Sequence, residues 1–168
     1  ATVNLTWDMA SGVSLTSVTD YLTIDKDYRE DADSSPYPFF HYESTQEFDQ
    51  LSQELRLNGS DDSFQWQAGI YYLNIDTDVG GVFDLDLFTF GEGTDFGQVV
   101  NIGGHQSNVE TDSWAVFAQG EWELAEAVTG ILGVRYSDDE RDIDYSGFDN
   151  FYGDVLTTET GAWDNFSY

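Results

Sequence analysis

Residues 114–136 decide the fold, and they read WAVFAQGEWELAEAVTGILGVRY. From Trp114 to Leu124 every second residue is apolar or glycine, and the intervening positions include Glu121 and Glu123. The alternation resumes at Val128 and continues to Tyr136, after the short connection Ala125–Ala127. A period of two is typical of a β-strand with one apolar face. The stretch therefore predicts an antiparallel hairpin whose two strands share an apolar face.

The same alternation recurs along the chain, and no window shows the 3.6-residue period of an amphipathic helix. Six strands are expected, at roughly residues 3–9, 13–25, 47–58, 64–76, 108–124 and 128–144. In 13–25 the pattern does not decide which face is apolar. The predicted fold is all-β, an antiparallel up-and-down meander.

The connections between these strands alternate in length. Short turns are expected at residues 10–12, 58–63 and 125–127, whereas about 26–46, about 77–107 and the residues after about 144 would form long loops. All short turns then lie at one end of the sheet. Outer-membrane barrels have short periplasmic turns and long extracellular loops. The pattern therefore favours a partial transmembrane β-barrel with long extracellular loops.

Aromatic spacing agrees with a membrane-spanning wall. Trp114 and Trp122 are eight residues apart, which is ~27 Å along a strand and about 20 Å in height at a tilt near 45°. An outer-membrane barrel has an apolar band about 25 Å tall between two aromatic girdles. The expected membrane-interface aromatics are Trp66, Tyr72, Trp114, Trp122 and Tyr136.

Composition excludes several classes of protein. The 168 residues contain 33 acidic and 5 basic side chains, a formal charge of −28. Nucleic-acid binding needs a basic footprint, so no nucleic-acid partner is expected. A chain that is 40% hydrophobic and 16% aromatic is too apolar for an acidic disordered tail. No cysteine is present, which excludes disulfides and thiolate metal sites.

Several segments are similar to one known family. Gln53–Leu57 (QELRL) followed by Trp66–Tyr72 (WQAGIYY) resembles a hairpin of TonB-dependent outer-membrane receptors. Trp114–Trp122, followed across its turn by Gly133–Glu140 (GVRYSDDE), resembles another such hairpin, and Thr16–Tyr21 matches a looser upstream pattern. The resemblance covers roughly residues 13–145.

This resemblance implies a location and a function. Members of the family lie in the Gram-negative outer membrane, as a barrel of about 22 strands with a plug domain inside. They take up ferric siderophores, cobalamin or sugars. The implied partners are outer-membrane lipid, the rest of the barrel with its plug, an inner-membrane energising complex reached through a missing N-terminal part, and a small ligand such as an iron chelate. Residues 1–168 contain no plug, so we expect a partial barrel domain taken from a larger receptor.

Two other interpretations remain open from the sequence. One is a soluble, secreted carbohydrate-binding β-sandwich, which buries a similar alternation between two sheets. The other is a complete eight-stranded barrel, in which Val82–Phe90 and Gln98–Ile102 form an extra hairpin. On the fragment interpretation, Phe83, Leu85 and Leu87 would instead form a short hairpin within an extracellular loop.

No catalytic residue, metal site or cofactor is predicted, and the chain is not expected to be an enzyme. His41 and His105 are the only histidines and are interpreted as isolated loop residues. The acidic residues of 138–144 are interpreted as a solvated loop. Residues 36–42 (PYPFFHY) contain several rings, which either stack on a ligand at the barrel mouth or pack the loop onto its neighbours. The candidate ligand contacts are Tyr37, Phe39, Phe40 and Tyr42.

Overall fold

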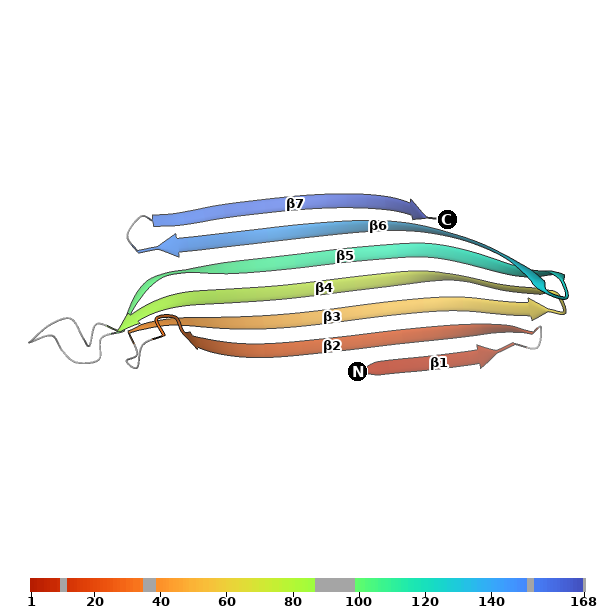
Figure 1. Ribbon diagram of the computed structural model, residues 1–168, viewed down its shortest axis with the longest axis horizontal. Coiled ribbons are helices and arrows are strands. Elements are labelled where there is room, and N and C mark those ends of the chain that lie inside the picture. The colour runs from red at the N-terminus through yellow and green to blue at the C-terminus, as the bar shows by residue number, and fades with distance from the viewer. Residues whose placement is uncertain (10–11, 35–38, 87–98, 151–152, 168) are drawn as a thin grey trace, which may run out of the picture.

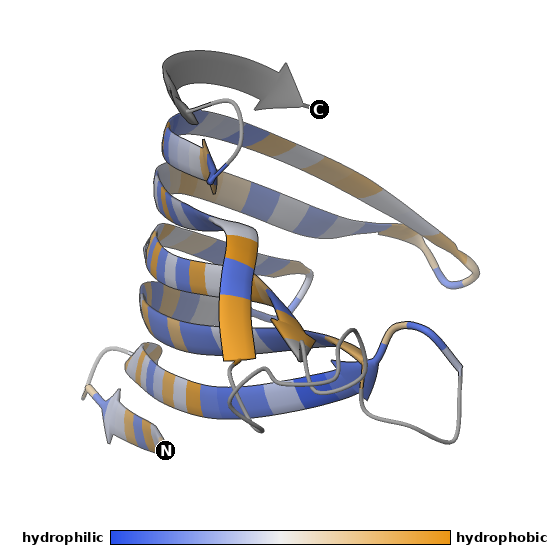
Figure 2. Ribbon diagram, turned by 90° about the vertical axis from the view of Figure 1, so that its left-hand side faces the viewer, coloured by the Kyte–Doolittle hydropathy of each residue, from blue (hydrophilic) through white to orange (hydrophobic). Residues whose placement is uncertain are grey.

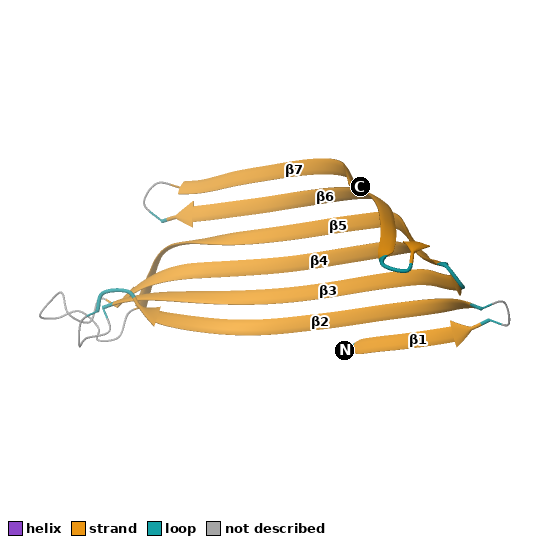
Figure 3. Cartoon of the chain, turned by 45° about the vertical axis from the view of Figure 1, so that its right-hand side comes forward, coloured by secondary structure: helices purple, strands orange, loops and turns teal. Residues whose placement is uncertain are grey.

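The computed structural model describes residues 1–9, 12–34, 39–86, 99–150 and 153–167, which form one antiparallel sheet (Figure 1). Seven strands lie side by side in chain order. They are β1 (Thr2–Asp8), β2 (Val13–Asp31), β3 (Phe40–Asp61), β4 (Phe64–Asp86), β5 (Val99–Ala125), β6 (Val128–Asp149) and β7 (Gly153–Ser167). No helix occurs among the described residues, and hence none that is long and apolar enough to cross a bilayer (Figure 3).

Each of the six predicted ranges coincides with a strand, but the strands are longer and a seventh follows them. β2 continues to Asp31 and β3 begins at Phe40, so most of the long connection expected at 26–46 is strand. Likewise β6 continues to Asp149, through the acidic segment interpreted as a loop. The apolar alternation of 128–136 was readable, whereas the polar extensions carry no apolar face to reveal them.

The extra hairpin of the eight-stranded alternative is not present in the described residues. Leu85 pairs with Val100, and Asp86 pairs with Val99, so both segments extend the β4–β5 ladder rather than forming strands of their own. Phe83 and Leu85 likewise belong to β4, not to a hairpin within a loop; Leu87 lies outside the described residues. The β-sandwich alternative is wrong too, because the described strands make one sheet and no second layer covers it.

The three predicted tight turns lie at one end of the sheet (Figure 1), but β6 ends at Asp149 and β7 begins at Gly153, so the connection at the opposite end, which was expected to be a long loop, is short as well. In the first, Gly12 has a φ of +76°, which glycine adopts without steric cost. Gly12 N donates to Met9 O at 3.2 Å, and Met9 N donates to Val13 O at 2.9 Å. The other two turns centre on residues 62–63 and 126–127. We call this end the turn end and the opposite end the loop end.

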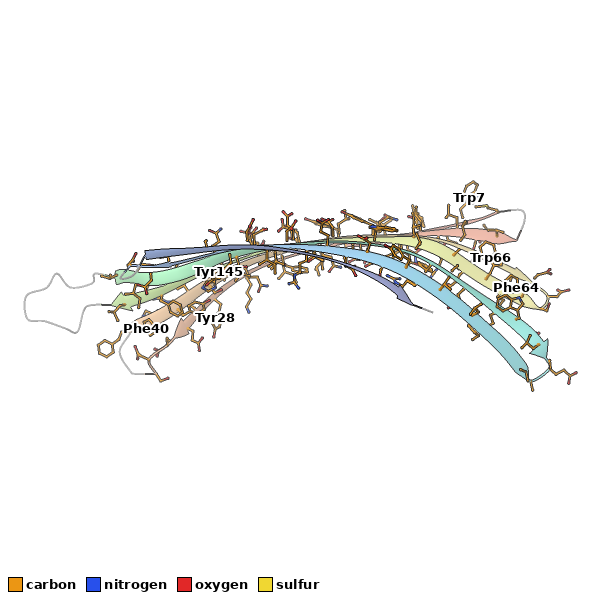
Figure 4. All side chains as sticks on the ribbon, turned by 90° about the horizontal axis from the view of Figure 1, so that it is seen from above. Trp7, Tyr28, Phe40, Phe64, Trp66 and Tyr145 are labelled. Carbon is orange, nitrogen blue, oxygen red and sulfur yellow. The ribbon has the colours of Figure 1, made fainter. Side chains whose placement is uncertain are left out.

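The strand register assigns every side chain to one of two faces, because directly paired residues share a face. Trp114 pairs with Tyr72, and Ala118 pairs with Ala68, so the apolar sides of β4 and β5 coincide. The sheet is bowed, with Trp7 on its convex side and Phe40 on its concave side (Figure 4). Apolar and polar residues alternate in short bands along the strands (Figure 2).

The same register settles β2, whose face was undecided. Leu15 pairs with Trp7 on one side and with Leu57 on the other, so odd-numbered residues of β2 join the convex face. This places Ser17 and Thr19 there as well, opposite Leu55 and Gln53. Gln53 donates from Nε2 to Ser17 Oγ at 3.0 Å, and Thr19 Oγ1 donates to Gln53 Oε1. These polar side chains therefore satisfy one another on an otherwise apolar surface.

The convex face is uncovered. Leu5 is 65% exposed and Leu132 is 64% exposed, whereas Ala115 on the concave face is the one apolar residue that the described part of the chain buries, at 1%. Soluble monomers rarely leave an apolar surface of this extent in water. Something other than these residues must cover it.

An arginine placed first on the convex face and then on the concave face tests which of the two faces meets lipid. Ala118 lies midway between Trp114 and Trp122 on the convex face, and Gln119 lies beside it on the concave face. We expect Ala118→Arg to reduce insertion into membranes, since an arginine at the midplane of a barrel's lipid face costs about 2–4 kcal/mol. Gln119→Arg should insert normally. The folded fraction in lipid vesicles measures both, and equal loss in the two variants would contradict the assignment.

Close packing at the turn end gives a second prediction. A Cβ on Gly59 would lie 2.5 Å from Trp66 Nε1, so the indole rests on this glycine. Gly59→Ala should displace the ring and destabilise the intact protein by about 1–3 kcal/mol. At Gly133 a Cβ would meet nothing nearer than 3.7 Å. Gly133→Ala is therefore the matched control, and denaturant midpoints that shift equally would refute the packing argument.

Candidate functional site

A row of rings crosses the concave face at its loop end. Phe40 and Tyr42 come from β3, Phe83 from β4, His105 from β5 and Tyr145 from β6. The ring centroids of Tyr42 and Phe83 are 4.8 Å apart, and those of Phe40 and Phe83 are 5.8 Å apart. His105 lies 6.3 Å from Tyr42 and 6.2 Å from Tyr145, nearly parallel to both. We call these five residues the aromatic row.

Two glycines allow the row to form. Gly81 and Gly147 are the residues directly opposite His105 on β4 and β6. A Cβ on Gly81 would lie 2.5 Å from both the Tyr42 hydroxyl and His105 Cε1. A Cβ on Gly147 would lie 3.3 Å from the Tyr145 hydroxyl. The Tyr42 hydroxyl therefore lies over Gly81, and the Tyr145 hydroxyl lies over Gly147. These two glycines are the residues that pair with His105.

The row remains accessible on the concave side. Phe83 is 36% exposed and Tyr145 is 40% exposed. Most of its neighbours on this face are uncharged, among them Ser44, Ser107 and Ile143, but Glu30 lies opposite Tyr42 on β2, and Asp149 lies opposite the residue that pairs with Phe83. Hydrogen bonding to Glu30, together with that carboxylate's charge, raises the pKa of the nearby Tyr28 above its ordinary value. The row is therefore an exposed, weakly charged surface of ring faces and polar ring atoms.

Only part of this row was predicted. Of the four candidates, Phe40 and Tyr42 are in the row, Phe39 lies just before β3, and Tyr37 lies outside the described residues. His105 is not an isolated loop residue: it belongs to β5 and is flanked by two tyrosine rings. Sequence reasoning missed Phe83 and Tyr145 as well. The missing signal was the pairing of distant strands, since all three lie in segments that were taken for loops.

The predicted interface aromatics share the convex face and form two groups. Near the turn end, Trp122 stacks on Phe64 at 4.8 Å, with Trp66 beside them. Toward the loop end, the ring centroids of Trp114 and Tyr136 are 5.5 Å apart, and the Tyr72 hydroxyl donates to Asp112 Oδ1 at 2.8 Å. The apolar band of the convex face lies between the two groups.

Beyond Trp114, the convex face becomes strongly acidic. Four carboxylates lie directly opposite one another across four neighbouring strands: Asp49, Asp76, Glu110 and Asp142. Like charges in directly paired positions normally destabilise a sheet. Asn108 Nδ2 donates to both Asp76 and Asp78, at 3.0 and 3.1 Å. Other carboxylates that the register places there include Glu47, Asp112, Asp138, Glu140 and Asp144. The two faces thus differ sharply in charge at the same height.

The turn end of the concave face holds a polar hollow of about 370 Å³. Hydroxyl and amide side chains line most of it, namely Ser14, Asn58, Ser60, Gln65, Gln67 and Gln119. In the middle of the sheet, Arg56 Nη1 forms an ion pair with Glu54 Oε1 at 3.4 Å. The Arg135 guanidinium lies 6.0 Å from the Tyr71 ring centroid. The hollow and the aromatic row are at opposite ends of one face.

The described residues contain no group of three His, Cys, Asp or Glu side chains arranged to hold a metal ion. The rings of the aromatic row and their polar atoms offer ring stacking and hydrogen bonding. Such surfaces recognise ligands whose own rings or apolar faces can stack.

Comparisons with known proteins agree with this geometry. No curated protein sequence matches the chain. Among solved structures, the crystal structure of the ferric yersiniabactin uptake receptor FyuA from Yersinia pestis is similar, with a TM-score of 0.78 and 14% identity. The match covers 98% of this chain and 23% of FyuA, so this chain spans about a quarter of that receptor. The family model described as "TonB dependent receptor-like, beta-barrel" matches residues 1–168, and the chain therefore belongs to that family of receptors.

Proposed function

We propose that this chain is part of the barrel wall of a Gram-negative outer-membrane receptor that takes up a scarce nutrient such as a ferric siderophore. The aromatic row is the observation that supports this most. It lies on the concave face, which is the lumen side of a barrel, at the end away from the tight turns. In this family that end opens outward, where a ligand first arrives.

The convex face supports the membrane part of the proposal. Its exposed apolar band would contact lipid, and Trp66, Trp122, Tyr72, Trp114 and Tyr136 would lie at the two interfaces. Indole and phenol rings favour that position because the ring is apolar while the N–H or O–H group prefers water. The acidic surface beyond Trp114 would then lie outside the hydrocarbon.

The open sheet supports one more partner, the rest of the barrel, whereas the plug and the energising complex are proposed from the family. β1 and β7 are its two edges, and edge strands present unpaired backbone groups. Further strands of the same barrel would pair with them, with a plug against the concave face and an inner-membrane complex supplying energy. No catalysis is proposed for this chain.

The ligand contacts proposed here are Phe40, Tyr42, Phe83, His105 and Tyr145. We retain Phe39 as a candidate because it directly precedes Phe40, and Tyr37 on sequence grounds alone. Phe83 is the most informative of these, because its ring contacts both Phe40 and Tyr42.

Uptake assays test the proposal. A strain lacking the receptor should lose import of one member of a panel of radiolabelled ferric chelates of the catecholate, hydroxamate and phenolate classes. With that chelate, Phe83→Ala should weaken apparent affinity about 2- to 10-fold, since an aromatic pair contributes about 0.5–1.5 kcal/mol beyond area burial. Val79→Ala, on the same strand and face, should not.

The outcomes separate two claims. Unchanged import of every chelate in the deletion strain would contradict iron-chelate uptake. Import lost on deletion but unaffected by Phe83→Ala would leave the receptor function in place and remove the aromatic row from the ligand site.

A further inference from the structure

Most of the positive charge of the chain lies on the concave face. The sequence contains five basic side chains. The register places four of them on the same face as the aromatic row, namely Lys26, Arg56, Arg135 and Arg141. The fifth, Arg29, lies on the convex face and forms an ion pair there. The lumen side of this acidic chain therefore holds the groups that attract anions.

Two of these arginines lie in one row across the sheet. Arg56 on β3 and Arg135 on β6 are connected through Gly69 and Phe117, each residue being paired directly with the next. The Phe117 ring lies over Gly69, because a Cβ on this glycine would be 2.6 Å from Phe117 Cζ. An aromatic ring therefore covers the backbone between the two arginines.

The two guanidinium groups approach the same pair of residues. Glu54 and Tyr71 lie directly opposite each other on β3 and β4. Arg56 Nη1 lies 3.4 Å from Glu54 Oε1, and Arg135 Cζ lies 6.0 Å from the centroid of the Tyr71 ring. Arg135 and Tyr71 come from the strands on either side of β5, so they meet above it, where Ala115 is 1% exposed. The guanidinium groups thus flank one short section of the lumen wall.

Hydrogen-bond donors outnumber acceptors in this section. Within the part of the chain that the structure describes, Arg135 forms neither an ion pair nor a hydrogen bond. Arg56 Nε is buried and has no acceptor there either. The Arg56 side chain as a whole is 37% exposed, and Arg135 is exposed, so both can be reached from the lumen. A buried donor without an acceptor points to a group that the sheet itself does not supply.

A carboxylate fits this place. The planar guanidinium presents a fork of donors that matches the two oxygens of a carboxylate, and its face stacks on aromatic rings such as Tyr71. One added negative charge would balance Arg56 and Arg135 against Glu54. A phosphate monoester carries a charge of about −1.5 to −2 and would exceed that balance.

We propose that Arg56 and Arg135 bind a carboxylate group of the ligand on its way through the lumen. Arg141 lies on the same strand and face between Arg135 and Tyr145, so a further positive charge stands between the aromatic row and this site. Asp139, which lies there as well, already accepts a hydrogen bond. The inference rests on the proposed function, because the carboxylate would belong to the transported nutrient, and it assigns that nutrient to the organic anions.

Titration calorimetry of the purified full-length receptor with citrate, a small soluble carboxylate, tests this. The wild type should bind citrate and should not bind trimethyl citrate, which has the same skeleton without the charges. Arg135→Gln should weaken citrate binding at least about tenfold, since it removes hydrogen bonds to a charged group. Arg135→Lys, which keeps the charge but not the fork, should have an intermediate affinity.

Arg141→Gln is the matched control. Arg141 lies on the same strand and face, is likewise without an ion pair among the described residues, and shares its row with Thr111, Ile75 and Gln50 instead of a second arginine. This variant should bind citrate as the wild type does.

Phenylglyoxal, which modifies free guanidinium groups, locates the bound anion. Citrate should slow the modification of Arg56 and Arg135, measured by mass spectrometry of peptides, and should leave the rate at Arg29 unchanged.

Four contrary results would each overturn the inference. These are no citrate binding, an affinity that Arg135→Gln does not change, equal loss in Arg141→Gln, and an Arg56 and Arg135 that are unreactive before citrate is added, because another part of the receptor would then cover them. A receptor that imports its chelate and needs Phe83, but binds no citrate, would retain the proposed function without this site. Citrate binding with the expected variant effects would support the site even where deletion spares the import of every chelate.

Discussion

The hydrogen-bonded register between neighbouring strands is the constraint on which the rest of this structure depends. It fixes which side chains share a face, so a slip of one residue would exchange the two faces of a strand. The pairing of Trp114 with Tyr72 and of Gly81 with His105 belongs to the same β4–β5 ladder. One ladder therefore sets both the apolar convex surface and the aromatic row on the opposite side.

The two faces meet different surroundings, and their compositions follow from that. Over the band between Trp114 and Trp122 the convex face is apolar, and its polar exceptions, Ser17, Thr19 and Gln53, bond to one another. Farther along the same strands it becomes a surface of directly opposed carboxylates, which only water or counter-ions make tolerable. At that height the concave face carries the aromatic row, with Glu30 beside Tyr42 and with Asp139 and Arg141 on β6. The two faces therefore differ in the density of carboxylates, and the aromatic row lies on the face that carries fewer of them.

Sequence reasoning reached the fold wherever a strand had an apolar face to alternate. Trp114–Leu124 and Val128–Tyr136 were predicted as a hairpin, and they pair with each other as parts of β5 and β6. It failed where strands leave the apolar band, because polar residues such as those of 26–31 read alike in a strand and in a loop. The aromatic row was the part least predictable from the sequence. Tyr42 was predicted as a ligand contact, but Phe83, His105 and Tyr145 come from distant segments that only the register brings together. A group of residues that comes from four different strands leaves no motif in any one segment of the sequence.

Spin-label accessibility along β5 tests the central claim that the convex face lies in hydrocarbon. The chain contains no cysteine, so single cysteines at positions 114–124 place one label at a time within it. In the full-length receptor in lipid, we expect labels at even positions to be relaxed by dissolved oxygen and those at odd positions by a water-soluble nickel complex. The two profiles should alternate with a period of two. Even positions that respond to the aqueous reagent, or that neither reagent reaches, would contradict the account.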